Sequence, residues 1–314
     1  MMINKLADTV VTIAAIIALV PTLFAGDEKS GFSLYCGSDP LILKEIAQAA
    51  TRGSVVVIDT RALSLGDMEL LATAVRAKKG NVLAYLSIGE LHSSQKDAFM
   101  KTAEEGFDFE SMAVNKNQVF DFIRVDAQSA TWKKWVHMEA FKLLSSPGIG
   151  GLFLDTVDMI DVYAGKREWK LPRREKSIDA MIQLIRSLKH NHSEKYIFQN
   201  GGLNLIGETV FVGNDTGIDI PGMALQKEHP DNPDGLLWEN AFQGTDPWTM
   251  GRLADLKEIQ QAGFTKVFAL GYQTACPKPV RFFEKCRAEK FTGASSTSSE
   301  LLHEVLAFGF TEAQ

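Results

Sequence analysis

The sequence predicts an α/β protein that forms a single (β/α)₈ barrel, and two observations support this fold class. Eight short apolar runs typical of buried strands recur along the 314 residues, and most are followed by segments with apolar residues at helical spacing. Strands that alternate with helices form a parallel sheet, and eight repeats are enough to close it. A doubly wound open sheet is the alternative, but no Gly-rich phosphate loop follows the first strand.

The predicted elements are runs whose composition matches strands covered on both faces or amphipathic helices. The predicted strands are Phe32 to Cys36, Val55 to Asp59, Val82 to Ile88, Phe120 to Val125, Gly151 to Asp155, Tyr196 to Asn200, Gly235 to Glu239 and Lys266 to Tyr272. The predicted helices are Leu41 to Ala50, Met68 to Lys79, Thr131 to Leu144, Lys176 to Lys189, Met250 to Ala262 and Pro279 to Ala288.

Two segments fall outside the simple repeat. Thr209 to Asp234 is rich in Gly and Pro, which predicts a long loop before the seventh strand and a candidate substrate-binding loop. Thr292 to Ser299 consists of small residues and reads as a linker, followed by a short helix-like run. The predicted barrel domain therefore spans 31–290, with a linker and C-terminal tail at 291–314.

The N-terminus has the layout of a signal peptide. Lys5 precedes a mostly apolar run from Val10 to Leu19, and Ala25 is a suitable residue for cleavage. We therefore expect residues 1–25 to be a signal peptide and the protein to be secreted or extracytoplasmic, with no stable membrane partner beyond this segment. An uncleaved anchor is the alternative, although the apolar run is short for a membrane span.

Several partners and cofactors find no support in the sequence. A net charge of −6 without a basic cluster argues against nucleic acid. The histidines and cysteines have no metal-ligand spacing, and no Walker loop or Gly-x-Ser-x-Gly elbow is present, so we expect neither a metal nor a cofactor. Because the first and last strands of a barrel are neighbours, Cys36 and Cys276 are the pair expected to bridge in an oxidising compartment; three free thiols are the alternative.

Carboxylates follow several of the predicted strands, at the end of a barrel where active sites lie. Asp155 and Glu239 end two buried strands with no cation beside them, and alternation points both into the barrel mouth. Two such carboxylates are the minimal equipment for cleaving a glycosidic bond, so we predict them to be catalytic. Asp59, Glu90 and Asp158 occupy similar positions.

Each of those three acids has a structural alternative to substrate binding. Asp59 can pair with Arg61 or cap the following segment, Glu90 can support the site through hydrogen bonds, and Asp158 can cap a helix.

Other side chains near the strand ends are suited to contacts with sugars. Tyr85, Trp238 and Tyr272 can stack on sugar rings, although core packing explains them equally well. Asn200 can offer its amide to a hydroxyl, and the glycines after it can equally serve a tight turn.

Five of these motifs together resemble glycoside hydrolase family 114, the endo-α-1,4-polygalactosaminidase-like group of TIM barrels. They are Val55 to Asp59, Val82 to Glu90, Gly151 to Asp158, Phe198 to Gly201 and Leu237 to Asn240. The resemblance covers the predicted barrel and departs from the family pattern at Leu91 to Ser94 and at Thr209 to Asp234, which affects substrate identity more than fold.

The resemblance implies metal-free hydrolysis of an exopolysaccharide that contains α-1,4-linked galactosamine, with Asp155 and Glu239 as the acidic pair and Asp59, Tyr85 and Glu90 lining the cleft. We expect Asp155 to be the nucleophile or oxocarbenium stabiliser. Glu239 would be the acid/base, with Trp238 raising its pKa by desolvation; the roles can also be reversed. A non-catalytic polysaccharide-binding barrel and a glycosidase of another linkage, such as an α-galactoside hydrolase, are the alternative functions.

Overall fold

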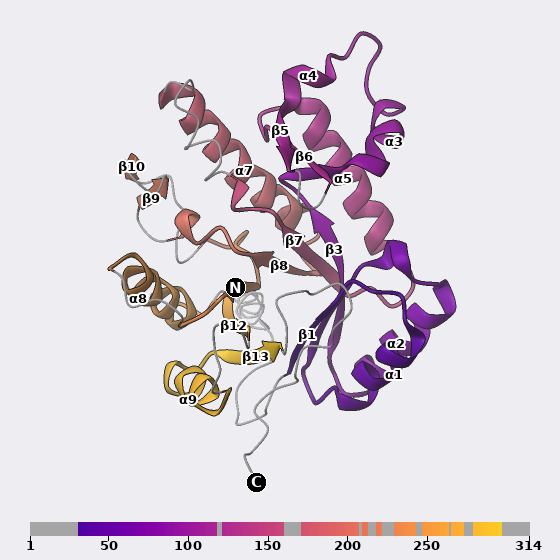
Figure 1. Cartoon of the computed structure of the whole chain (residues 1–314), viewed down its shortest axis with the longest axis vertical. Coiled ribbons are helices and arrows are strands. Elements are labelled where there is room, and N and C mark those ends of the chain that lie inside the picture. The colour runs from indigo at the N-terminus through magenta and orange to yellow at the C-terminus, as the bar shows by residue number, and fades with distance from the viewer. Residues whose placement is uncertain are drawn as a thin grey trace, which may run out of the picture.

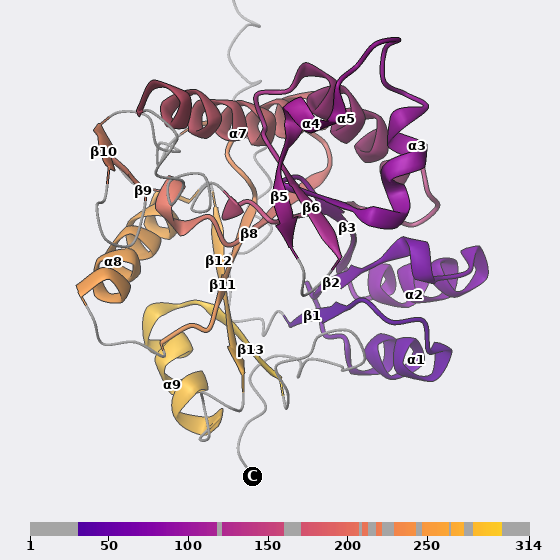
Figure 2. The ribbon, with the colours of Figure 1, turned by 45° about the horizontal axis from the view of Figure 1, so that its top comes forward.

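The chain folds around one parallel sheet. The computed structural model describes residues 31–117, 121–159, 171–206, 209–212, 218–221, 229–242, 247–263, 265–272 and 279–296. Within these ranges, eight parallel strands follow the order β1-β2-β3-β7-β8-β11-β12-β13, and helices lie around the outside (Figures 1 and 2). The terminal strands β1 and β13 lie next to each other, so the sheet curls into a nearly closed (β/α)₈ barrel, as predicted.

The elements alternate as expected of such a barrel. The barrel strands are β1 (Phe32–Tyr35), β2 (Val55–Ile58), β3 (Asn81–Ser87), β7 (Gly151–Asp155), β8 (Tyr196–Asn200), β11 (Gly235–Glu239), β12 (Lys266–Tyr272) and β13 (Thr292–Ser296). The surrounding helices are α1 (Pro40–Ala49), α2 (Leu65–Ala77), α5 (Ala130–Leu144), α7 (Leu171–Asn191), α8 (Pro247–Gln261) and α9 (Pro279–Glu289).

The predicted fourth strand, Phe120 to Val125, is not part of the barrel. Its described part forms β6 (Phe122–Val125), which pairs antiparallel with β4 (Glu90–His92) and β5 (Ala113–Asn117) in a separate three-stranded sheet. Three of the four residues of β6 are only partly buried, whereas barrel strands such as β2 are buried throughout. This small sheet, with α3 (Lys96–Met100) and α4 (Phe109–Met112), is an insertion between β3 and α5.

The eighth barrel strand is β13, in the segment predicted to be a linker. It pairs in parallel with β12, from Phe268 opposite Thr292 to Tyr272 opposite Ser296, so the barrel extends beyond residue 290. Its small residues have a packing reason, because a Cβ on Gly293 would lie 2.9 Å from Cys286 Sγ on α9. A small residue is needed where this strand approaches α9 closely. The same residue types are common in linkers, so the composition resembles that of a linker.

Alternation along each strand divides the core into two layers. Phe153, Phe198, Leu237 and Phe268 point into the barrel and pack together, with Phe198 and Phe268 ring centroids 4.8 Å apart. The residues between them face the helices instead. Burial of each such aromatic side chain contributes roughly 1.5–3 kcal/mol, so the barrel interior is a packed plug beneath the mouth.

Other expectations fall partly outside the described residues. The Thr209 to Asp234 segment contains a hairpin of β9 (Thr209–Val212) and β10 (Ile218–Pro221). The predicted signal peptide and Cys276 lie outside the described residues. Cys36 is a free thiol in this structure, and the expected bridge to Cys276 falls outside the described residues. No helix within the described ranges is long and apolar enough to span a membrane.

Candidate active site

The candidate site lies where the carboxyl ends of five barrel strands converge. In the sheet order, β8 lies between β7 and β11, so Asn200 lies between the strands that carry Asp155 and Glu239. Leu154 pairs with Gln199, and Asn200 pairs with Leu237, so Asp155 lies level with Asn200 and Glu239 two residues farther along. The stagger of the barrel brings the three side chains together at its mouth.

One amide joins the two predicted catalytic carboxylates. Asn200 Nδ2 donates to Asp155 Oδ1 and to Glu239 Oε1, each at 2.8 Å. Because both oxygens accept from one nitrogen, they are no farther apart than twice that distance, about 5.6 Å. The structure therefore brings Asp155, Asn200 and Glu239 into one hydrogen-bonded cluster.

Two tyrosines donate to the remaining oxygens of these carboxylates. The Tyr85 hydroxyl, from β3, donates to Asp155 Oδ2 at 2.5 Å, and the Tyr272 hydroxyl, from β12, donates to Glu239 Oε2 at 3.2 Å. Burial, followed by the nearby Asp155 charge, raises the Tyr85 pKa well above 10. Burial and Glu239 likewise raise the pKa of Tyr272, so both phenols stay protonated donors at neutral pH.

The pKa of Glu239 is raised above the usual range of a glutamic acid. Burial is the largest cause and the charge of Asp155 is the second, while the bonds from Asn200 and Tyr272 act in the opposite direction. The shift does not come from Trp238, which faces the outer layer and packs against Phe242 with ring centroids 4.9 Å apart. Trp238 therefore lies outside the cluster at the mouth.

The backbone turns sharply just after each of the three strands. Thr156, Gly201 and Asn240 follow Asp155, Asn200 and Glu239, and their φ angles are 61°, 61° and 52°. Left-handed conformations are costly for residues other than glycine, and such strain is concentrated at functional sites.

Thr156 is held in this conformation by its own hydroxyl. Its Oγ1 accepts from the Gly89 backbone N–H at 2.8 Å and lies 2.8 Å from Ser87 Oγ. These contacts attach the turn after β7 to the end of β3. Ser87 and Thr156 are not among the predicted site residues, although both lie at strand ends.

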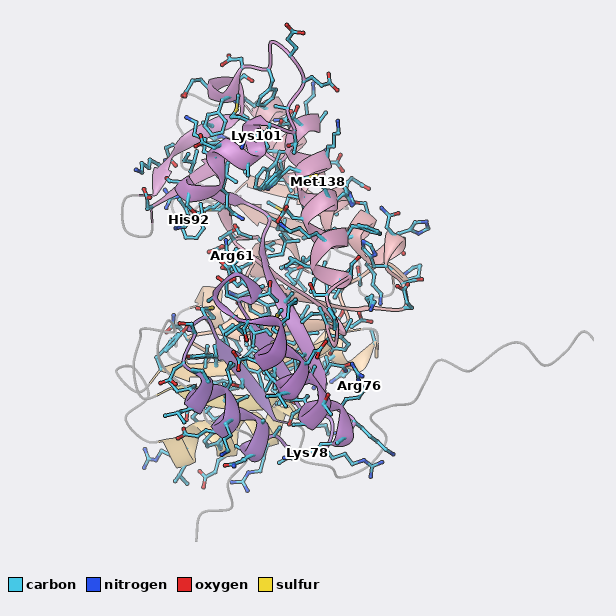
Figure 3. All side chains as sticks on the ribbon, turned by 90° about the vertical axis from the view of Figure 1, so that its right-hand side faces the viewer. Arg61, Arg76, Lys78, His92, Lys101 and Met138 are labelled. Carbon is cyan, nitrogen blue, oxygen red and sulfur yellow. The ribbon has the colours of Figure 1, made fainter. Side chains whose placement is uncertain are left out.

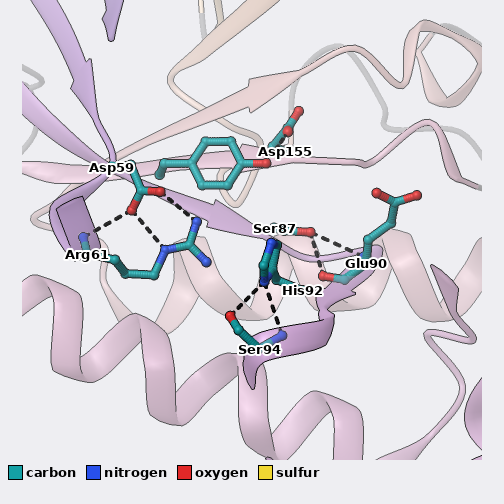
Figure 4. Close-up of polar contacts among 8 residues, drawn as sticks. Asp59, Arg61, Ser87, Glu90, His92, Ser94 and Asp155 are labelled. Carbon is teal, nitrogen blue, oxygen red and sulfur yellow. Dashed lines mark hydrogen bonds and ion pairs between the residues drawn. The ribbon is translucent and has the colours of Figure 1, made fainter. Parts of the chain in front are cut away.

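Asp59 is paired as its structural alternative predicted. Arg61 Nε donates to Asp59 Oδ1 at 2.8 Å, and the other arm of the guanidinium reaches Oδ2 at 2.7 Å (Figure 4). The guanidinium carbon also lies 5.8 Å from the centre of the Tyr85 ring. Asp59 thus holds Arg61 against the tyrosine that contacts Asp155, which sequence reasoning did not foresee.

Glu90 belongs to the small antiparallel sheet. It is buried and accepts from Arg124 Nε at 3.1 Å across the β4–β6 pair. Figure 3 shows His92 of the same strand above Arg61, on one side of the molecule. Glu90 therefore pairs with Arg124 within the inserted sheet, and its predicted part in the site stays a prediction. Asp158 lies on the turn after β7, and its Cβ is 3.8 Å from where a Cβ on Gly201 would be.

Cys36 adds a thiol at the end of β1 that sequence reasoning treated only as a disulfide partner. Burial, followed by the charges of Asp59 and Asp155, raises its pKa to about 12. The thiol is therefore protonated and a poor nucleophile at neutral pH. Within the described part of the chain, no group of three or more His, Cys, Asp or Glu side chains could hold a metal ion.

A separate cavity of about 440 Å³ lies near the N-terminal ends of α5 and α7. It is lined by Ser111, Asp126, Gln128, Ser129, Arg173 and Lys176. Asp126 is its buried acid, and it already accepts from Gln128 and Ser177 while pairing with Arg173. These bonds attach α7 to the start of α5, so the acid of this cavity already has a structural role. We therefore take the barrel mouth as the candidate active site.

Comparison with known proteins gives a match in structure. No family model and no curated protein matches the sequence. The structure matches the glycoside hydrolase domain of PelA from Pseudomonas aeruginosa over 89% of this chain and 98% of that one, at TM-score 0.58 and 19% identity. This chain therefore shares its fold with that domain. It also matches Aspergillus fumigatus Ega3, in complex with galactosamine, over 88% of this chain and 94% of that one, at TM-score 0.56 and 12% identity.

Proposed function

We propose that this protein is an exported glycoside hydrolase that cleaves an exopolysaccharide containing α-1,4-linked galactosamine. The observation that carries the proposal is the pair of carboxylates, Asp155 and Glu239, held by one amide at the mouth of the barrel. The likeness in fold to a glycoside hydrolase domain and to a protein bound to galactosamine supports the substrate class. The signal-peptide layout of residues 1–25 supports export.

In the proposed mechanism the two acids have different protonation states. Glu239, whose pKa is raised by burial and by Asp155, protonates the leaving oxygen. Asp155, whose two oxygens accept hydrogen bonds from Tyr85 and Asn200, attacks the anomeric carbon or stabilises positive charge there. Ionised Glu239 then takes a proton from the incoming water.

The separation of the carboxylates favours retention of configuration. Retaining enzymes hold the two carboxyl groups roughly 5–5.5 Å apart, and inverting enzymes need roughly 6.5–9.5 Å to admit a water. The upper bound of about 5.6 Å between the two bridged oxygens is close to the retaining separation. We therefore expect the first product observed by NMR during hydrolysis to keep the α configuration.

The test is release of reducing ends from partially deacetylated α-1,4-galactosaminogalactan by the purified protein. We expect wild type to cleave it, and Asp155→Asn and Glu239→Gln each to lose at least roughly 1,000-fold in rate. Asp179→Asn and Glu104→Gln, at exposed positions, are the matched controls and should retain activity. Binding without cleavage would indicate a non-catalytic barrel, and cleavage of neutral α-galactans alone would indicate another linkage. Either result would overturn the proposal.

A further inference from the structure

The amide that links the two carboxylates has a role of its own, and the inference rests on the proposed function because it concerns the same site. We propose that Asn200 is a positioning residue, which holds Asp155 and Glu239 at a fixed separation and couples their charges, rather than a residue that binds the sugar. The expectation from sequence was a contact between its amide and a substrate hydroxyl. The geometry gives the amide other partners.

The two donor hydrogens of Asn200 are both committed. A side-chain –NH₂ group has two N–H bonds, and Nδ2 directs them to Asp155 and to Glu239 at equal distances of 2.8 Å. No hydrogen remains on this nitrogen for a substrate hydroxyl. A sugar bound between the carboxylates would therefore receive no hydrogen bond from Asn200 Nδ2 while these two bonds are in place.

The orientation of the amide follows from charge. If the side chain were turned over, its carbonyl oxygen would face two carboxylate oxygens, which are acceptors as well. In the observed orientation Asn200 Oδ1 is buried and has no hydrogen-bond partner within the described structure. Native proteins rarely leave such an atom unpaired, so the bridging contacts of the –NH₂ group outweigh the loss at the oxygen.

The residues before and after Asn200 in the chain both fix its position. Phe198, two residues earlier, packs inside the barrel against Phe153 and Phe268. The two residues after Asn200, Gly201 and Gly202, both have positive φ angles. A Cβ on Gly202 would lie 2.4 Å from Val157 Cγ1 on the turn after β7. The turns after β7 and β8 are therefore packed together, which ties Asn200 to the strand of Asp155.

The charged and titratable groups around this bridge come from every neighbouring strand. Glu239 is faced by Asp155 on β7 and Tyr272 on β12. Asp155 is faced in turn by Tyr85 on β3 and by Cys36 at the end of β1, while Arg61 lies over the Tyr85 ring. Asn200 is the member of this group that contacts both carboxylates, so its removal should affect both at once.

The first readout needs no turnover. Carboxyl ¹³C NMR titrations of wild type and Asn200→Ala, with signals assigned through Asp155→Asn and Glu239→Gln, report each acid directly. We expect the Glu239 carboxyl to titrate at a higher pH in Asn200→Ala than in wild type, because it loses a donor that favours its charged form. Asn191→Ala, at the exposed end of α7, is the matched control and should leave both titrations unchanged.

The second readout separates positioning from substrate binding. We expect Asn200→Ala to lower kcat at least about tenfold with KM within about twofold, and to move the limb of the pH profile that Glu239 governs upward. Asn200→Ser, which can donate one hydrogen, should give intermediate values and replaces the alanine variant if that variant does not fold. An unmoved Glu239 titration, or a raised KM with unchanged kcat, would overturn the proposal. If wild type cleaves no polymer, the proposed function fails while the titrations still decide the role of Asn200.

Discussion

The Tyr85 hydroxyl provides the sharpest test of how the site holds Asp155, the proposed nucleophile. It donates to Asp155 Oδ2 at 2.5 Å, and burial keeps its pKa well above 10, so it remains a donor at any ordinary assay pH. Tyr85→Phe deletes this single contact and preserves the ring that packs beside Phe153. Asp155 keeps its bond from Asn200, so the variant removes one of two donors.

The expected loss follows from the strength of a hydrogen bond to a charged group. Such a bond contributes about 1.5–3 kcal/mol. If its loss falls on the transition state, and about 1.4 kcal/mol corresponds to a factor of ten, kcat should fall roughly 10–150-fold. KM should change little, because the hydroxyl contacts the protein rather than the sugar.

The measurement is the initial rate of reducing-end release, with the fold checked by circular dichroism. Tyr196→Phe is the matched control, because its hydroxyl donates to the Asp234 carbonyl at 3.3 Å at the opposite end of the barrel. That variant should stay within about twofold of wild type. A Tyr85→Phe rate within twofold of wild type, or an equal loss in Tyr196→Phe, would refute the role of Tyr85 in holding the proposed nucleophile, Asp155.

Three further predictions concern stability. Because the folded-state pKa of Glu239 is raised, its burial is tolerated below the unfolded-state pKa and becomes unfavourable as pH rises. Glu239→Gln should therefore unfold at a higher temperature than wild type at pH 7, and the gap should close toward pH 4; a constant gap would contradict this. Gly202→Ala should lose about 2 kcal/mol or more in denaturant unfolding, because Gly202 has φ 63° and its new Cβ would collide with Val157; an unchanged midpoint would contradict it. A chain ended before Thr292 loses β13 and should show no cooperative thermal transition, whereas the full chain should show one. A transition retained by the shorter chain would contradict the barrel assignment.

Most of the barrel could be predicted from sequence because its strands are covered on both faces. Val55–Ile58 is buried at every position and contains only Val and Ile, so the run stands out without any structural information. The run at Phe122–Val125 is also mostly apolar, but it is the central strand of the small antiparallel sheet, paired with both β4 and β5, and composition alone does not reveal this. Thr292–Ser296 was missed because its small residues resemble a linker, and the contact of Gly293 with Cys286 on α9 exists only in the folded chain.

In the site, too, some features could be predicted from sequence and others exist only in the folded chain. The positions of Asp155 and Glu239 followed from strand ends, and the structure places them together. Their bridge through Asn200 depends on β8 lying between β7 and β11 and on the stagger of the pairing, which a single sequence does not contain. The placement of Trp238 could have been predicted. If Leu237 and Glu239 face the interior, alternation places Trp238 on the helix side, where it lies.

The choice of residues at the turns shows how the fold accepts local strain to aim the carboxylates. Glycine is the least costly residue at positive φ, yet Thr156 occupies that position after Asp155 at a cost of about 1–3 kcal/mol. Its hydroxyl contacts Ser87 Oγ and the Gly89 N–H, so a glycine there would relieve the strain and lose the link to β3. Close packing reinforces that link, because a Cβ on Gly89 would lie 2.2 Å from the Thr156 carbonyl oxygen. Thr156 thus adopts a strained backbone conformation, and its contacts with β3 fix the direction of the Asp155 side chain. A preorganised site requires such a fixed direction.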